Sequence, residues 1–349
     1  IILVGCEDDN IADMEVFEPT PYQLELPAVL QPFEPLMKIP DDNPLTVEGV
    51  ELGRKLFFEP RLSANGTLSC AGCHLPGRSF AENTQFSTGI DGIAGTRNSQ
   101  SIVNLSWMNS LFWDGRAENI EEQALQPVVN PIEMHNSWSE VENELMSDEE
   151  YRRLFKAAFG TENIDSMLVV KAIAQFERTL NSGNSAFDKY INEEPTGWRQ
   201  EDFNAALRGL EVFMAEEKGD CFHCHGDPTN PFWTDNSFHN NGLDATFSDL
   251  GLGAITGSES DNGKFKTPTL RNLLFTAPYM HDGRFNSLEE VVEHYSTGLK
   301  NSSTIDPLMK KIDQGGVQLS PQDKSDLIMF LKSLTDSSFV ANPIFQDPE

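Results

Sequence analysis

Four of the five cysteines of this chain lie in two copies of the pattern Cys-x-x-Cys-His, at Cys70–His74 and Cys221–His225. The two thiols of such a pattern can form thioethers with the vinyl groups of one haem, and the histidine that follows can bind the haem iron. A zinc site of four cysteines and a pair of redox dithiols are the alternatives. Zinc requires no histidine after each pair, and redox dithiols usually lie in a βαβ pattern that this sequence lacks. The pattern therefore predicts two covalent haem c groups. The attaching residues would be Cys70, Cys73, Cys221 and Cys224, with His74 and His225 on the irons.

The two motifs divide the chain into halves that carry one haem each. A chain of 349 residues is long enough for two domains with separate cores. We expect an N-terminal haem domain at 43–195 and a C-terminal haem domain at 196–340, because breaks rich in Asn, Ser, Gly and Pro occur at 181–184 and 195–197. Residues 7–42 are acidic and then proline-rich, which is typical of an extended tether or of a strap over the body and not of a helix.

Helical signals dominate both halves. Four residues have the N-cap or capping-box patterns that begin helices: Thr46, Ser137, Ser287 and Ser320. Strand patterns are scarce, and the segments 76–100 and 227–263 are rich in glycine and polar residues, which indicates loops. The expected fold is mostly α, with two cytochrome c-like domains and long loops over the haems.

The balance of charge excludes one class of partner. The chain has 25 basic and 55 acidic residues, for a net charge of −30 at pH 7. We expect no nucleic-acid partner, because a polyanion would be repelled. A basic redox protein would be attracted to such a surface, although the charge can equally serve solubility alone.

Further motifs carry a resemblance to a known family. The segments Phe112–Ala117, Thr267–Asn272 and Pro278–Gly283 occur in this order around the second haem motif. With them, residues 43–335 closely resemble the bacterial di-haem cytochrome c peroxidase and MauG family. The resemblance implies an enzyme that reduces H₂O₂ to water with electrons from a small donor protein, a cytochrome c or a cupredoxin. It also implies that electrons pass from the C-terminal haem to the N-terminal haem.

The resemblance implies roles for three residues of the first half. Glu133 matches the acid/base carboxylate of the family, Gln123 its distal amide and Trp113 the tryptophan between the two haems. In that role Glu133 moves a proton from the near oxygen of peroxide to the leaving oxygen. The alternatives are a solvated loop carboxylate for Glu133 and a packing residue for Trp113.

Two positions depart from the pattern of most peroxidases in the family. Tyr295 replaces the methionine that binds the second haem iron, as a tyrosine does in MauG, so Tyr295 is the expected ligand, with Met280 and Met309 as rivals. His294, beside it, is expected on the surface. Ile90 replaces a histidine that covers the first iron. Because isoleucine cannot bind iron, the first haem is expected to be open in the oxidised protein.

The resemblance also implies a calcium ion between the domains. Its ligands would be the side chain of Asn98 and the carbonyl oxygens of Thr276 and Pro278, since oxygen ligands suit this ion. The alternative is a loop contact without metal. His281, in the same loop, is expected to bond a haem propionate.

Residues 1–6 end in Cys6 and look like the remnant of a lipoprotein signal peptide. A lipid on Cys6 would anchor the protein to a membrane. No other stretch approaches the ~20 apolar residues of a membrane span, so Cys6 is the expected anchor. The alternative is a free cysteine in a tail. Because haem c attachment in this family belongs to exported proteins, we expect a lipid-anchored protein on the periplasmic side of a Gram-negative envelope, at the outer membrane.

Two other functions stay open. A MauG-like oxidase would use peroxide to modify a tryptophan or tyrosine of a protein partner, and Tyr295 and Ile90 favour it. A plain di-haem electron carrier would have both irons blocked by protein ligands, with Gln123 and Glu133 away from iron. A homodimer stays open as the oligomeric state.

Overall fold

The computed structural model describes residues 17–348, so Cys6 lies outside the described residues. Helices dominate, and the prediction of a mostly α fold is confirmed. The α-helices are α1 (Val47–Phe57), α2 (Cys70–Cys73), α3 (Ile120–Val129), α4 (Trp138–Ser147), α5 (Glu149–Phe159), α6 (Ser166–Glu177), α7 (Ala186–Ile191), α8 (Gln200–Met214), α9 (Phe222–His225), α10 (Leu252–Thr256), α11 (Leu288–Glu293), α12 (Pro321–Ser333) and α13 (Ser337–Val340).

Shorter elements join these helices. The 3₁₀ turns are η1 (Gln31–Leu36), η2 (Pro60–Leu62), η3 (Pro76–Arg78), η4 (Leu105–Trp107), η5 (Glu259–Asp261), η7 (Ile312–Gln314) and η8 (Pro343–Phe345), and η6 (His294–Gly298) is a π-helical turn. Strands β1 (Phe238–His239) and β2 (Phe265–Lys266) pair antiparallel, with Phe238 opposite Lys266. None of the helices between residues 17 and 348 has the length and apolar character needed to cross a bilayer.

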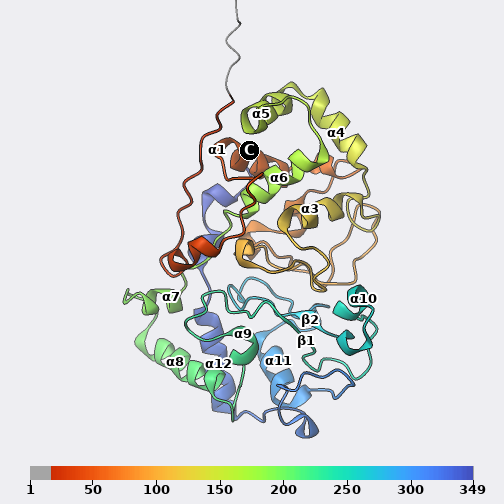
Figure 1. Cartoon of the computed structure of the whole chain (residues 1–349). Helices are drawn as coiled ribbons and strands as arrows, with labels where there is room; N and C mark the ends of the chain where they lie inside the picture. Colours follow the sequence, from red (N-terminus) through yellow and green to blue (C-terminus); the bar gives the residue numbers. More distant parts are fainter. Residues whose placement is uncertain (1–16, 349) are drawn as a thin grey trace, which may run out of the picture.

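The molecule has two lobes (Figure 1), and each lobe is built on two helices that cross at a glycine. In the upper lobe of Figure 1, α1 packs against α6, and a Cβ on Gly53 would lie 1.8 Å from the carbonyl oxygen of Ala172. In the lower lobe, α8 packs against α12, and a Cβ on Gly209 would lie 1.9 Å from the carbonyl oxygen of Asp326. Any side chain would push these helices apart, so both crossings require glycine.

Local hydrogen bonds form the expected helix starts. Thr46 and Ser320 cap α1 and α12 with their hydroxyl groups, and Ser287 begins a complete capping box at α11. The capping box expected at Ser137 is only half formed. Its hydroxyl caps α4, but its own N–H donates to the side-chain oxygen of Asn136 at 2.8 Å. The preceding asparagine therefore competes successfully for the donor that the box would use.

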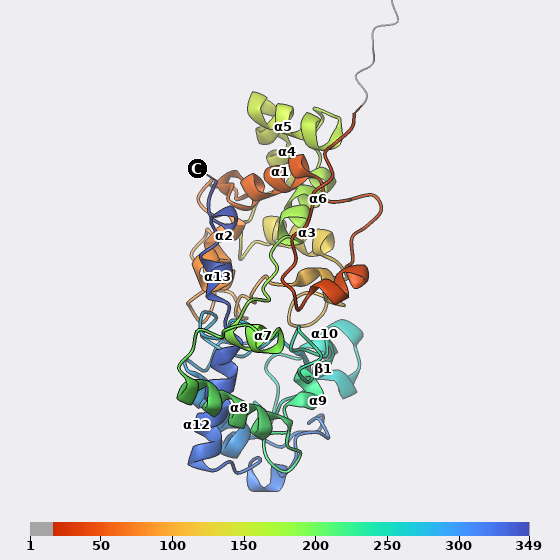
Figure 2. The same ribbon diagram turned by 90° about the vertical axis from the view of Figure 1, so that its left-hand side faces the viewer.

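The polypeptide crosses between the two lobes twice. The first hydrophobic core extends along the chain to Leu180, and Phe187 on α7 already packs in the second core. The second core ends at Leu334, after which Phe339 and Phe345 pack back into the first core. Figures 1 and 2 both show this C-terminal segment, in dark blue, running up to the first lobe. Each lobe therefore depends on residues from outside its own half of the sequence.

Residues 17–46 form a strap that contacts both lobes. The strap is mostly extended, but it contains the short 3₁₀ turn η1. Pro32 lies at the start of this turn, where proline needs no N–H partner and is tolerated. Leu30 of the strap is fully buried and packs with Trp107 from the first half and Phe232 from the second. The strap therefore ties the two lobes together.

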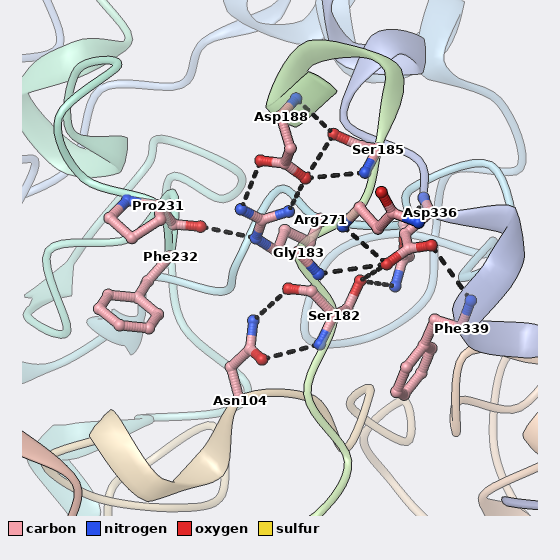
Figure 3. Close-up of polar contacts among 12 residues, drawn as sticks. Asn104, Ser182, Gly183, Ser185, Asp188, Pro231, Phe232, Arg271, Asp336 and Phe339 are labelled. Atoms are coloured by element: carbon pink, nitrogen blue, oxygen red, sulfur yellow. Dashed lines mark hydrogen bonds and ion pairs between the residues drawn. The ribbon is translucent and has the colours of Figure 1, made fainter. Parts of the chain in front are cut away.

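Buried polar groups surround the segments at which the chain crosses between the lobes (Figure 3). Arg271 forms a two-point ion pair with Asp188 at 2.7 and 2.9 Å and donates a third bond to the carbonyl oxygen of Pro231 at 2.6 Å. Close by, the carboxylate of Asp336 accepts a bond from the backbone N–H of Gly183 at 3.1 Å. These partners satisfy charges that would otherwise be costly to bury.

Candidate active site

A single cavity of about 1130 Å³ receives residues from both lobes. All three functional residues of each Cys-x-x-Cys-His motif line it: Cys70, Cys73 and His74, and Cys221, Cys224 and His225. The tertiary structure thus brings the two motifs, far apart in sequence, to the walls of one space. Such a cavity is large enough for bulky ligands.

The first motif lies on α2 and the residue that follows it. The ring Nδ1 of His74 lies 2.9 Å from the carbonyl oxygen of Phe80, so Nδ1 carries the proton and donates it to that oxygen. The Nε2 atom then keeps its lone pair, which is the form of imidazole that binds a metal. Burial lowers the pKa of His74, which favours this neutral form.

The second motif repeats this arrangement on α9. The Nδ1 of His225 lies 3.2 Å from the carbonyl oxygen of Trp233, and burial lowers the pKa of His225 to about 4. Both imidazoles are therefore neutral and held by a backbone carbonyl. Together with two thiols per motif on the same cavity, they fit the chemistry of one c-type haem at each site.

The environment of the cysteines argues against the zinc and dithiol alternatives. Burial raises the pKa of Cys73 to about 11 and that of Cys221 to about 12, so neither thiol is poised as a thiolate. Within residues 17–348, no cluster of three or more Cys, His, Asp or Glu side chains could hold a metal ion. A zinc site of four cysteines would require such a cluster.

Helix α3 and the turn after it bring the two expected distal groups to the cavity. Asn119 caps α3, and the face of the helix that carries Gln123 and Pro127 lines the cavity. In the turn that follows, the side-chain amide of Asn130 donates to the carboxylate of Glu133 at 2.6 Å. Burial raises the pKa of Glu133, despite that hydrogen bond. Glu133 is therefore a half-buried, cavity-lining carboxyl and not a solvated loop residue.

Ile90 lies beside this turn but outside the cavity. Its backbone N–H donates to the carbonyl oxygen of Glu133 at 3.0 Å, and its side chain is not part of the cavity wall. Of the histidines in the described part of the first lobe, only His74 lines the cavity. His135 is largely exposed and bonds to Asp91 at 2.5 Å. Within the described first lobe, no imidazole other than that of His74 is therefore available to bind the first iron from the cavity wall.

Trp113 is linked by hydrogen bonds to the expected calcium and propionate residues. Its indole N–H donates to the carbonyl oxygen of Asn98 at 2.8 Å, and the backbone N–H of Asn98 donates to the carbonyl oxygen of His281 at 2.8 Å. The side-chain NH₂ of Asn98 donates to two backbone carbonyls, which leaves its Oδ1 as the available oxygen ligand. Thr276 and Pro278 line the same cavity.

His281 is held rigidly in this region. Its ring stacks on Phe265 with centroids 3.6 Å apart and planes 12° apart. Burial lowers the pKa of His281. The imidazole is therefore held in a fixed orientation on the cavity wall.

Tyr295 lies in the π-helical turn η6, and Met280, an alternative ligand for the second iron, lies close to it. Its hydroxyl accepts a hydrogen bond from the side-chain amide of Asn241 at 3.1 Å, and the same amide nitrogen lies 3.5 Å from Sδ of Met280. Met309 also lines the cavity. Burial raises the pKa of Tyr295 to about 12. A π-helical turn is frequent at functional sites because it redirects side chains.

The prediction that His294 lies on the surface is wrong. Its side chain is only 6% exposed, and its Nε2 contacts the carbonyl oxygen of Asn241 at 3.1 Å. The polar loop that contains Asn241 folds over this face of the helix. Helical spacing alone does not reveal a covering loop from a distant part of the chain.

Several charged groups on the cavity wall were not predicted from the sequence. Arg97 pairs with Asp114 and Asp249, and Lys266 donates to the carbonyl oxygen of Ser110 at 3.0 Å. Burial lowers the pKa of Lys266 to about 8. Two more residues belong to this group: His239, whose pKa is raised to about 11 chiefly by its hydrogen bond to Asp235, and Glu177. Of these, only Glu177 had a detectable signal, a carboxyl one turn after Ile173 on an apolar helix face.

Comparison with known proteins identifies the family of the chain. Residues 47–196 match the sequence family described as di-haem cytochrome c peroxidase. The chain is 36% identical over 299 residues to the methylamine utilization protein MauG of Methylophilus methylotrophus, and the match covers 84% of each chain. It is 33% identical over 310 residues to the cytochrome c551 peroxidase of Nitrosomonas europaea, which covers 86% of this chain and 84% of the relative.

A solved structure gives the same result. The crystal structure of a MauG-like protein associated with microbial copper homeostasis matches with a TM-score of 0.83 and 36% identity, over 94% of this chain and 99% of the other. The chain belongs to the di-haem cytochrome c peroxidase family, and the family predicted from its motifs is confirmed. It is an oxidoreductase, and membership of a di-haem family implies two haem c groups.

Proposed function

We propose that the protein is a di-haem peroxidase that reduces H₂O₂ to water with electrons from a small redox protein. One observation carries the proposal. Glu133 and Gln123 line the same cavity as His74, and no other imidazole from the described residues of the first lobe lines it. A plain electron carrier needs both irons blocked and has no use for an acid/base pair, so this arrangement disfavours it.

The roles proposed for the first site come from the family resemblance, and the position of these residues on one cavity supports them. His74 binds the first haem through Nε2, and Cys70 and Cys73 attach it. When bound, the haem supplies a redox-active iron at which peroxide is reduced. Glu133 takes a proton from the near oxygen of peroxide and gives it to the far oxygen, which leaves as water. Gln123 holds the far oxygen in line through its side-chain amide. Overall, one peroxide takes up two electrons and two protons and yields two waters.

The raised pKa of Glu133 suits this task. A group that first accepts and then donates a proton works best when its pKa lies near the working pH. Burial moves the carboxyl of Glu133 in that direction, and Asn130 holds it in a fixed orientation. The half-buried side chain therefore combines a suitable pKa with a fixed position on the cavity wall.

Electrons reach the first site through the second. Cys221 and Cys224 would attach the second haem and His225 would bind its iron, with Tyr295, or its rivals Met280 and Met309, as the second protein ligand. Trp113 lies between the two sites and shortens the electron-transfer distance. The donor is a small cytochrome c or a cupredoxin, which the net charge of −30 would attract if it is basic.

Further features complete the proposal. Asn98, Thr276 and Pro278 hold one calcium ion, and His281 bonds a haem propionate. The two haems belong to domains at 43–195 and 196–340. Cys6 carries a lipid that anchors the protein on the periplasmic side of the outer membrane. For the oligomeric state, we propose a homodimer as the alternative to a monomer.

A MauG-like oxidase is the second candidate. The relatives with 36% identity include proteins named MauG or MauG-like. Tyr295, which the resemblance matches to a tyrosine of MauG, lines the cavity. Such an enzyme would consume peroxide and oxidise an aromatic side chain of a protein partner.

One assay tests the leading proposal and separates the candidates. The purified holoprotein is mixed with H₂O₂ and a reduced small cytochrome c, and both are followed spectroscopically. We expect oxidation of two cytochromes per peroxide consumed. Slow peroxide consumption without oxidation of any cytochrome or cupredoxin donor would favour the MauG-like oxidase, and no reaction with peroxide would leave an electron carrier.

A further inference from the structure

Glu177 is a buried carboxyl on the cavity wall that the proposed reaction does not use. It is the last residue of α6 and is only 3% exposed. Its Oε2 has no hydrogen-bond partner among the described residues, although it is shielded from solvent. Glu177 lines the cavity one helical turn after Ile173, which also lines it. The charge of Glu177 acts on Cys70 of the first haem motif and raises the pKa of that thiol. The carboxyl therefore faces the first haem site without a partner.

The neighbouring arginine does not neutralise this carboxyl. Arg178 is fully buried and forms a two-point ion pair with Glu121 on α3 at 2.8 and 2.9 Å. Glu121 also accepts a bond from Asn43 at 2.7 Å, so this pair is complete without Glu177. A buried carboxylate without a partner is costly, and the neutral acid is the stable form. Burial raises the pKa of Glu177 to about 8, although Arg178 opposes the shift.

Three groups from three elements face Glu177. They are Arg178, directly after the end of α6, Glu121 on α3 and Cys70 on α2. The first two are locked in their mutual ion pair, and Cys70 does not titrate once it is a thioether. In a weakly polar interior, a unit charge that appears nearby shifts the pKa of a carboxyl strongly. Oxidation of the first haem iron adds such a positive charge.

We propose that Glu177 is the redox-linked proton-exchange group of the first haem. The inference rests on the proposed haem at His74. When the iron is ferrous, Glu177 is a neutral acid. When the iron loses one electron, Glu177 loses one proton to solvent, and the carboxylate compensates the new positive charge. The net charge of the buried site is then the same in both states, and each electron that returns brings one proton back.

The consequence is a pH-dependent potential with a defined sign. The carboxyl binds its proton more tightly beside ferrous than beside ferric iron. Reduction therefore takes up a proton, and the midpoint potential of the first haem falls as the pH rises, up to the pKa of about 8 that burial gives the acid. A glutamine at position 177 cannot exchange a proton, so it removes this slope while it keeps the shape of the side chain.

Potentiometric titration of the holoprotein over a range of pH tests the proposal. In the wild type, we expect the potential of the first haem to fall with a slope that approaches about one proton per electron. In Glu177→Gln, the slope in the same range should be lost or nearly lost. Glu82→Gln is the matched control. Glu82 also acts electrostatically on His74, but it has a partner, since Ser87 donates a hydrogen bond to it. Its loss should shift the potential equally at every pH.

Infrared difference spectra between the reduced and oxidised protein provide a second readout, which uses the wild type and so does not depend on the folding of a variant. In the wild type, the band of a protonated carboxyl should disappear on oxidation. The same change should be seen in Glu133→Gln and should be absent from the difference spectrum of Glu177→Gln. Absence of any such band in the wild type would overturn the proposal. So would an unchanged potential slope in a Glu177→Gln protein with two haems and normal peroxide turnover. Loss of covalent haem or of peroxide consumption in the wild type would instead overturn the proposed function.

Discussion

The side-chain amide of Asn241 donates a hydrogen bond to the hydroxyl of Tyr295 at 3.1 Å. The oxygen that would bind the second iron is therefore oriented by a residue from a different loop. Because the amide donates, it stabilises negative charge on the tyrosine oxygen, which is the state in which a phenolate binds iron. The relationship gives Tyr295 an advantage over Met280, whose sulfur is a weak acceptor at 3.5 Å from the same nitrogen.

Tyr295→Met should raise the midpoint potential of the second haem, because a thioether favours ferrous iron more than a phenolate does. Tyr295→Phe should remove the low-spin spectrum of that haem. Met280→Leu and Met309→Leu serve as controls and should leave the spectrum unchanged. If Tyr295→Phe retains the low-spin spectrum and one of the methionine variants loses it, the methionine is the ligand.

Replacement of Cys221 and Cys224 by alanine should remove one covalent haem and leave the other. Each motif carries its own thiols and its own imidazole, so the two attachments are chemically independent. Acid-acetone extraction of the denatured protein, followed by a haem assay of the pellet, measures the result. Haem that moves to the organic phase from the wild type would contradict covalent attachment at either motif.

Glu133→Gln should slow the reaction with H₂O₂ by about two orders of magnitude or more, because a positioned acid/base group contributes on that scale. Both haem spectra should stay intact. In the wild type the rate should fall as the pH drops through the raised pKa of Glu133, since only the carboxylate can accept the first proton. Stopped-flow mixing measures both effects. Glu122→Gln, on the same helix–turn unit but outside the cavity wall, is the control and should react at the wild-type rate.

The fully oxidised protein should react with H₂O₂ without prior reduction. No histidine of the described first lobe other than His74 lines the cavity, so the first ferric iron should be high-spin. Ile90→His should leave that spectrum unchanged, because residue 90 lies outside the cavity wall and Gly89 beside it packs tightly on the carbonyl of Ile132. Electron paramagnetic resonance and stopped-flow mixing test this. An oxidised enzyme that is inert until half-reduced would show that another group covers the iron.

Asp188→Asn should destabilise the protein by about 3–5 kcal/mol, since it leaves the buried guanidinium of Arg271 without its charge partner. Chemical unfolding of the holoprotein measures the change. Asp202→Asn, in the exposed pair with Arg199, is the control and should change the stability little. Equal effects of the two substitutions would mean that the buried Arg271–Asp188 pair contributes no more to stability than an exposed pair.

Local patterns in the sequence predicted what depends on neighbouring residues. The spacing within each Cys-x-x-Cys-His motif defines the haem chemistry, because the thiols and the imidazole act within one helical turn. Thr46 and Ser287 were predictable as helix caps for the same reason, since each bonds to a backbone group three residues away. The order of the motifs along the chain was sufficient to predict the family.

Only the tertiary structure determined which distant groups meet. The burial of His294, the bond from Asn241 to Tyr295 and the missing partner of Glu177 all depend on which segment covers a given helix face. The return of Phe339 to the first core likewise depends on the path of the whole chain. The free energy of a buried polar group is set by its surroundings in space, and contacts across many residues leave no periodic pattern in the sequence from which they could be predicted.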